Sequence, residues 1–257
     1  MNIQRFLRPL LHSVIRARRA NGRHGVAALL MAAAMALPAY AAPPKPTRVP
    51  DTIEQRAAAC IACHGREGSS TEAAYFPRLS GKPAAYLFNQ LQSYRDGRRF
   101  NSDMTHMVQH LSDAYLREIA DYFASIDLPY PPVATTTDAT PQMLAHGKAL
   151  VFEGDAARGI PACAQCHGQA LTGVLPGIPG LVGLPRLYLS SQLGAWVTND
   201  RHALEPDCMA QVGRKLTTAD INAVTSWLVM QPVPANPKPA ANAPSPVPMA
   251  CSALNTR

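Results

Sequence analysis

A short pattern, Cys-x-x-Cys-His, occurs twice in the 257-residue sequence and restricts its possible folds and functions more than any other feature. Two cysteines one helical turn apart can present both thiols to one side, and the histidine directly after them adds a nitrogen ligand. This arrangement is typical of c-type haem attachment, in which two thioether bonds hold the porphyrin and an imidazole binds the iron. We therefore predict two covalently bound haem c groups. The residues concerned are Cys60, Cys63 and His64 in the first copy and Cys163, Cys166 and His167 in the second.

Three other interpretations of the cysteine pairs fit the sequence less well. A structural zinc site would use both pairs together, but about 100 residues separate them and each pair has its own histidine. A thioredoxin-like redox pair expects a βαβ setting, which the sequence does not indicate. Two ordinary disulfides would need no histidines.

The two motifs belong to a longer internal repeat. The segment "FPRLSGKPAAYLFNQL" (76–91) matches "IPGLVGLPRLYLSSQL" (178–193), with a shared frame of Pro, Leu, Gly, Pro, Tyr-Leu and Gln-Leu. Further on, "DMTHMVQHLSD" (103–113) matches "CMAQVGRKLTT" (208–218). The offset stays at 102 to 105 residues, which indicates one duplicated domain rather than a solenoid, whose periods are shorter, about 20–50 residues.

Composition places the domain boundaries. Prolines and small polar residues after residue 126 indicate a linker. We predict a first cytochrome c domain at 42–130, a linker at 131–140 and a second domain at 141–231. The Pro- and Ala-rich tail at 232–257 shows no periodicity, so we expect it to be extended and poorly packed.

Within each copy the local patterns are helical, and we find no convincing β-sheet. Pro83 can occupy the first turn of a helix that closes near Gly97, and Ser112 and Thr217 can cap the last helix of each copy. The fold class predicted is mainly α, with a small helical bundle around each haem. The apolar stripes of the last helices consist of Leu116, Ile119, Ala120 and Phe123 in the first copy and Ile221, Val224 and Leu228 in the second.

Each haem iron then needs a sixth ligand. Met104 and Met209 occupy matching positions, 40 and 42 residues after their histidines, and each precedes the last helix of its copy. Although methionine usually fills gaps in cores, this register favours both as axial ligands. Met107 is a local rival, but a valine is its counterpart, so we interpret it as a packing residue. Three nearby histidines have no histidine counterpart in the other copy: His106, His110 and His202.

Pro77 and Pro179 are candidates for orienting the two histidines that bind the irons. They follow His64 and His167 by 13 and 12 residues, and a proline offers a carbonyl without an N–H. Metal-bound imidazoles usually donate their second N–H to a carbonyl or carboxylate. We expect these two carbonyls to be the acceptors, although both residues could simply form turns.

Two cysteines remain after haem attachment, Cys208 and Cys251. In an oxidising compartment an even remainder suggests a disulfide, which would join the tail to the loop that bears Met209. Free or differently paired thiols remain possible, and Cys208 could instead be a thiolate ligand of the second iron.

The ordered set of motifs resembles the two-haem cytochrome c4 family, from the Cys-x-x-Cys-His pattern to a Met seven residues before a Leu. The resemblance spans about Thr52 to Gln231. It implies tandem class I cytochrome c domains in the bacterial periplasm, with a respiratory donor complex and a terminal oxidase or reductase as partners. The second copy departs from the family over "DRHALEPDCM" (200–209).

The amino-terminal segment, residues 1–41, has the composition of a secretory signal. It holds six of the 24 basic residues and no acidic ones, followed by a short apolar run that ends in small residues. That run is shorter than the roughly 18 residues expected of a membrane span, so we expect no transmembrane span in the mature chain. The remaining residues are close to neutral, 18 basic against 17 acidic, and give no reason to expect nucleic-acid binding.

With both axial positions filled, each iron can only exchange electrons. We therefore predict a periplasmic electron carrier rather than an enzyme. One alternative is a haem subunit docked on a periplasmic dehydrogenase that holds the substrate chemistry. A second alternative, a haem enzyme, would need an open or Cys-ligated second haem.

Overall fold

The structure is a computed structural model that describes residues 49–70, 75–130, 132, 134 and 136–255. The predicted signal segment, residues 1–41, lies outside them. Within the described part of the chain, no helix has both the length and the apolar character needed to cross a membrane.

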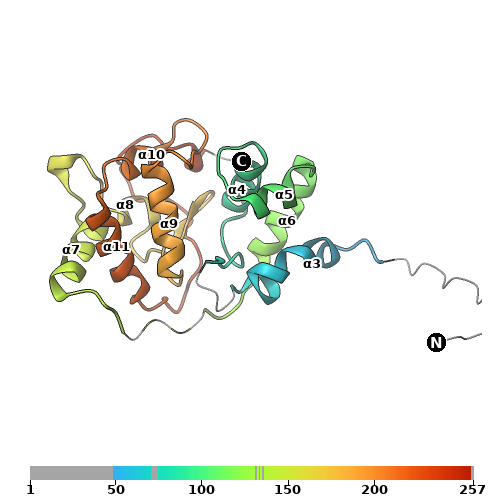
Figure 1. Ribbon diagram of the computed structural model, residues 1–257, viewed down its shortest axis with the longest axis horizontal. Helices are drawn as coiled ribbons and strands as arrows, with labels where there is room; N and C mark the ends of the chain where they lie inside the picture. The colour runs from blue at the N-terminus through green and yellow to red at the C-terminus, as the bar shows by residue number, and fades with distance from the viewer. Residues whose placement is uncertain (1–48, 71–74, 131, 133, 135, 256–257) are drawn as a thin grey trace, which may run out of the picture. The chain divides into compact units, whose positions relative to one another are not determined.

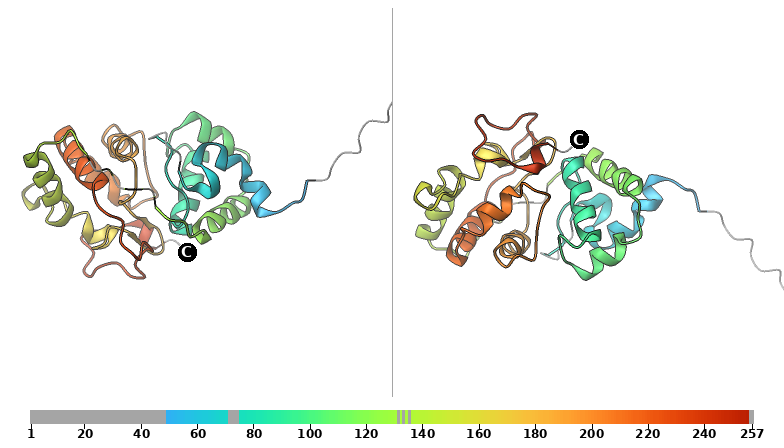
Figure 2. Two further views of the ribbon diagram at one scale, coloured as in Figure 1. Left: turned by 90° about the horizontal axis from the view of Figure 1, so that it is seen from below. Right: turned by 90° about the horizontal axis from the view of Figure 1, so that it is seen from above.

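The first half of the described chain forms four α-helices that pack on one another (Figures 1 and 2). α4 packs against α5 and α6, and α3 packs against α6. A short 3-10 turn, η2 (Arg66–Gly68), follows α3. The helices are α3 (Ile53–His64), α4 (Ala84–Arg95), α5 (Ser102–Val108) and α6 (Asp113–Ser125).

The second half forms a separate group of packed helices. α11 packs against α7 and α9, and α10 packs against α9. Two short 3-10 turns, η3 (Ala156–Arg158) and η4 (Ser252–Leu254), belong to the same half. The helices are α7 (Pro141–Phe152), α8 (Ala164–His167), α9 (Arg186–Val197), α10 (Cys208–Gly213) and α11 (Thr218–Val229).

The helix starts follow the capping residues. Ser112 accepts a hydrogen bond from a backbone N–H in the first turn of α6, and Thr217 forms a reciprocal capping box on α11. Both predictions are confirmed. Pro83 lies just before α4 instead of within its first turn, because its ψ of 132° is extended. α4 ends at Arg95, and Gly97 takes a φ of +77°, which glycine adopts without a steric penalty.

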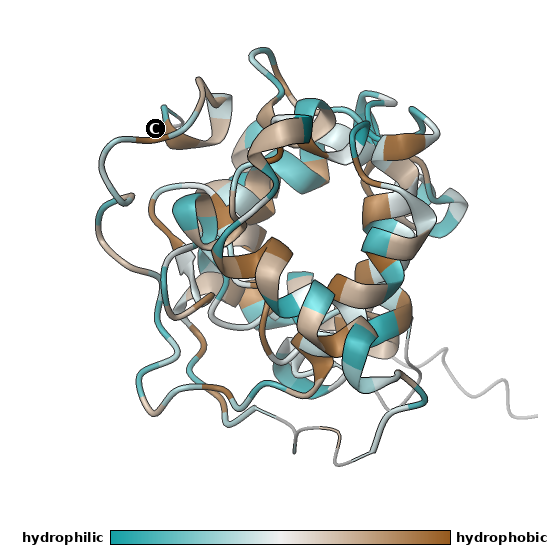
Figure 3. Ribbon diagram, turned by 90° about the vertical axis from the view of Figure 1, so that its left-hand side faces the viewer, coloured by the Kyte–Doolittle hydropathy of each residue, from teal (hydrophilic) through white to brown (hydrophobic). Residues whose placement is uncertain are grey.

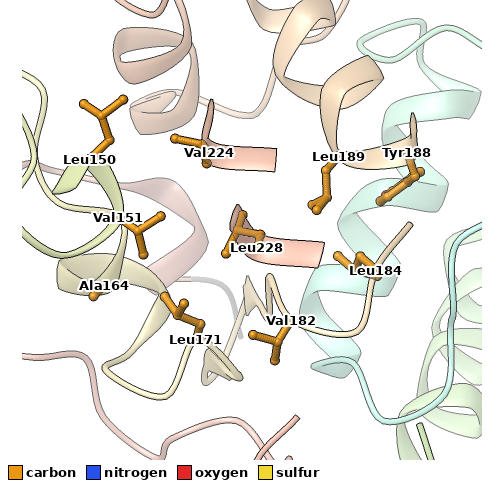
Figure 4. Close-up of a cluster of buried hydrophobic side chains, with 10 residues drawn as sticks. All are labelled: Leu150, Val151, Ala164, Leu171, Val182, Leu184, Tyr188, Leu189, Val224 and Leu228. Carbon is orange, nitrogen blue, oxygen red and sulfur yellow. The ribbon is translucent and has the colours of Figure 1, made fainter. Parts of the chain in front are cut away.

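Each group encloses its own hydrophobic cluster. In the first, the predicted stripe of α6 is buried together with side chains of α3 and α4. In the second, Val224 and Leu228 of α11 meet side chains of α7 and α9 (Figure 4). α7 and α11 approach closely at Gly147, where an added Cβ would lie 2.2 Å from the carbonyl oxygen of Ala223.

A small antiparallel ribbon, which the sequence did not indicate, joins β1 (Gly173–Val174) to β2 (Ile178–Pro179). Each strand is two residues long, too short for an alternating pattern to be recognised. Gly173 permits the turn, because its φ is +95° and an added Cβ would lie 2.6 Å from the carbonyl oxygen of Ile178.

The tail is extended and mostly exposed, as expected, but it is fixed to the second half at two places. Ala240 exchanges backbone hydrogen bonds with Gly173 and Leu175 next to β1. Farther on, Cys251 is buried, and Met249 packs beside it in a third hydrophobic cluster. Prolines prevent helix formation here but leave single N–H and C=O groups free to pair, so an irregular segment can still be fixed in place.

Candidate haem sites

Both Cys-x-x-Cys-His motifs lie where a helix ends. His64 is the last residue of α3, His167 is the last residue of α8, and both side chains are buried. A glycine in the left-handed region follows each, and at Gly65 an added Cβ would lie 2.3 Å from the carbonyl oxygen of Ser70. The chain must therefore turn sharply after each imidazole. The four motif cysteines are free thiols: Cys60, Cys63, Cys163 and Cys166.

Each imidazole is oriented by a proline carbonyl. Nδ1 of His64 lies 2.9 Å from the carbonyl oxygen of Pro77, and Nδ1 of His167 lies 2.7 Å from that of Pro179. When Nδ1–H donates to the carbonyl, Nε2 keeps its lone pair for a metal. Burial lowers the pKa of both histidines, although the hydrogen bonds to the prolines act in the opposite direction. The lowered pKa favours the neutral ring that a metal ligand requires.

A large cavity in the second half of the chain joins the predicted ligands. The cavity is lined by His167, Cys163 and Cys166 of the motif. Met209 of α10 lines the same cavity. Figure 3 looks onto this half, where the helices form a ring and carry both hydrophobic and hydrophilic residues. The donor set and the apolar lining fit haem c: two thiols, one imidazole and one thioether. The apolar contributors include Ile178, Leu184, Leu189, Val224 and Leu228.

Two orphaned donors in the same cavity strengthen this fit. Nε of Arg98 and Nε1 of Trp196 are buried and have no hydrogen-bond partner among the described residues. Both residues line the cavity. Buried N–H groups are normally satisfied, so these two indicate that an acceptor belongs in the cavity. The carboxylates of a haem would supply one.

The start of α10, which bears Met209, is held from two directions. Asp207 caps α10 by accepting from the backbone N–H of Ala210, at 2.9 Å, and also accepts from that of Ala203. The structure pairs Cys208 with Cys251 in a disulfide, with 5.0 Å between their Cα atoms. In this state Cys208 is unavailable as a thiolate ligand.

In the first half, α5 positions the corresponding methionine. Asn101 caps this helix by accepting from the backbone N–H of Met104, at 3.0 Å, and the Met104 side chain is half-buried. Met107 is 43% exposed, so its interpretation as a packing residue is wrong. Val108, one residue later, takes the buried position of the short helix instead.

The structure gives no support to a shared zinc site. Among the described residues, no three or more His, Cys, Asp or Glu side chains gather where they could hold a metal ion. Burial raises the pKa of the Cys163 thiol to about 11, which opposes the thiolate form that zinc requires.

A polar network, not foreseen from the sequence, joins the two halves of the described chain. Arg99 donates to Gln90 of its own half at 3.0 Å and to Gln192 of the other half at 2.5 Å. Arg201 reciprocates, donating to Gln192 at 2.9 Å and to Gln90 at 2.8 Å. The shared Gln-Leu frame of the repeat was the available signal, because both glutamines belong to it.

Comparison with known proteins agrees with the motif analysis. Residues 52–123 match the family model described as cytochrome c oxidase, cbb3-type, subunit III. A thiosulfate dehydrogenase electron acceptor from Thiomonas intermedia is 38% identical over 69% of this chain and 80% of its own length. Cytochrome c4 from Pseudomonas aeruginosa is 36% identical over 68% of this chain and 85% of its own length.

Solved structures give the same relationship. Reduced cytochrome c4 from Pseudomonas stutzeri has a TM-score of 0.60 and 32% identity, covering 69% of this chain and 96% of that one. A thiosulfate dehydrogenase from Marichromatium purpuratum has a TM-score of 0.60 and 30% identity, covering 67% of this chain and 36% of that one.

The fold and the comparisons define a two-haem c-type cytochrome, an electron-transfer protein rather than an enzyme. The chain belongs to the cytochrome c4 family. The predicted mainly α fold, its class I cytochrome c type and its haem c cofactors are confirmed.

Proposed function

We propose that each half of the chain binds one haem c with its own motif and its own methionine. In the second half, Cys163 and Cys166 attach the porphyrin while His167 and Met209 bind the iron. The observation that supports this most strongly is that all four residues line one apolar cavity. The first half uses Cys60, Cys63, His64 and Met104 in the same way.

The residues around each haem fix the ligands and exclude water. Haem c supplies one-electron exchange between Fe(III) and Fe(II). A His/Met ligand pair gives it a higher reduction potential than two strong donor ligands would. The carbonyls of Pro77 and Pro179 hold the imidazole rings in one orientation. The apolar lining keeps solvent from the iron, which limits reorganisation when an electron moves. The two domains run over 42–130 and 141–231, joined by the linker at 131–140.

The site of action in this proposal is the periplasm, where c-type relatives of this kind exchange electrons with other redox proteins. The disulfide between Cys208 and Cys251 suits an oxidising compartment. Cell fractionation with haem staining tests the location. Recovery with periplasmic markers would support it, and recovery with cytoplasmic markers would contradict it.

We infer that the donor is a dehydrogenase for a reduced sulfur compound such as thiosulfate. Relatives at 38% and 32% identity are electron acceptors of thiosulfate dehydrogenase, which supports this partner class. Stopped-flow mixing of the oxidised protein with a thiosulfate dehydrogenase and thiosulfate should reduce both haems. Omitting either component should leave them oxidised. Failure of the complete mixture, with dithionite still reducing the protein, would contradict this donor.

A second candidate is transfer to a terminal oxidase. It is favoured by the match of residues 52–123 to a cbb3-type oxidase subunit. Membranes that contain such an oxidase should then reoxidise the reduced protein in air, and cyanide should stop the reaction.

A further inference from the structure

A buried lysine from the first half of the chain lines the haem cavity of the second half. Lys82 directly precedes Pro83 and α4, and only 9% of its surface is exposed. It lies on the lining of the cavity that holds His167.

Within the part of the chain that the structure describes, the ammonium of Lys82 has no anionic partner. Among the described residues, no carboxylate lies within ion-pair distance of its Nζ. The Nζ of Lys82 lies 5.9 Å from the centroid of the Tyr86 ring. Two further buried cations, Arg99 and Arg201, bond to neutral Gln and Tyr side chains instead of acids. A buried charge is costly unless it is paired, so these three cations call for a counter-charge that the described residues do not supply.

The repeat shows that the helical fold does not require this lysine. The position that matches Lys82 is Leu184, which packs in the second hydrophobic cluster (Figure 4). The neighbouring positions of the frame are shared, with Tyr86 matching Tyr188 and Gln90 matching Gln192. A charge present in one copy alone points to a role specific to one of the two haems.

The cavity itself indicates the missing anion. Its lining includes Lys82 and also Arg98 and Trp196, whose buried Nε and Nε1 have no hydrogen-bond partner among the described residues, and haem c carries two propionate carboxylates. On the basis of the proposed haem sites, we propose that Lys82 is the counter-ion of a propionate of the haem bound by Cys163, Cys166 and His167. The first half of the chain thereby sets the reduction potential of the second haem.

The expected consequence is a difference between the two potentials. A cation close to one haem stabilises Fe(II) relative to Fe(III) in that haem, because the reduced iron carries less positive charge. Leu184, the counterpart residue, offers no charge to the first haem. Electrons should therefore prefer the second haem, and removing the charge of Lys82 should weaken that preference.

The test measures both midpoint potentials of the haem-loaded protein by spectroelectrochemistry. Lys82→Met and Lys82→Gln remove the charge at similar length, Lys82→Arg retains it, and Lys148→Met removes an exposed lysine as the matched control. Met104→His, which alters the first haem alone, assigns the two waves. Lys82→Met and Lys82→Gln should lower the potential of the second haem. The equilibrium constant for electron distribution between the haems should change about tenfold, equal to about 59 mV for one electron.

Lys82→Arg and Lys148→Met should leave both potentials within a small fraction of that change. Unchanged potentials in the two neutral variants would overturn the inference, as would a shift confined to the first haem. The proposed haem sites are tested separately by the spectrum of the unsubstituted protein. Two six-coordinate haems there, combined with no effect at Lys82, would defeat this inference alone.

Discussion

Removal of the Cys208–Cys251 disulfide should destabilise the second half of the protein without releasing its haem. The bond closes a loop across a sequence separation of 43 residues, for which the chain-entropy relation gives about 4 kcal/mol of unfolding free energy at 25 °C. The loop contains α10 and α11 and none of the motif cysteines, so haem attachment does not already restrain it. The full entropic contribution should therefore be measurable.

The appropriate variant replaces both cysteines by alanine, which leaves no free thiol. Its free energy of unfolding should fall by about 4 kcal/mol in guanidinium chloride, and its Tm by roughly 8–16 °C for a chain of this size. The matched control is Met249→Ala, which removes a half-buried contact of the tail and keeps the disulfide. The control should cost no more than about 2 kcal/mol. Melting of the double variant within 2 °C of the unsubstituted protein would refute the argument that the disulfide braces the start of α10.

Three further predictions concern single side chains. Met209→Ala should open the second haem, so that carbon monoxide binds there after reduction; an unchanged spectrum would exclude Met209 as the ligand. Gly147→Ala should lower the free energy of unfolding by about 1–3 kcal/mol, because its Cβ would meet the Ala223 carbonyl oxygen at 2.2 Å. A loss below about 1 kcal/mol in denaturant melts would contradict the close crossing of the two helices. Burial would raise the pKa of Asp220, but hydrogen bonds from Arg158, the Thr217 backbone and His146 outweigh it and hold the pKa below its usual 3.8. Its stabilising contribution is therefore present above about pH 4 and is lost as the pH falls below that value. Asp220→Asn should be less stable at pH 7 and lose less stability on acidification; parallel acid profiles would contradict this.

Much of the molecule could be predicted from residues close together in the sequence. The cap at Ser112, the capping box at Thr217 and the buried stripe from Leu116 to Phe123 follow from helix geometry alone. The two haem motifs are also local, and comparison between the two copies picked out Met104 and Met209 without knowledge of the fold. The two copies within one chain could be compared with each other in the way that related proteins usually are.

Features that depend on tertiary contact were missed. Lys82 stood in the sequence as one lysine before a proline, and nothing local indicated that it faces the cavity of the other half. The reciprocal bonds of Arg99 and Arg201 require both halves to be in place. The two places where the tail is fixed were missed, because the bridge at Ala240 and the disulfide at Cys251 leave no periodic pattern in the sequence.

The central claim is that both irons are closed by a histidine and a methionine, so that the protein can only transfer electrons. Exposure of the reduced, haem-loaded protein to carbon monoxide, followed by its absorption spectrum, tests this most directly. The account predicts an unchanged spectrum at both haems. A spectral change at either haem would reveal an iron that small ligands can reach and would contradict the assignment of the protein as a carrier with two filled sites.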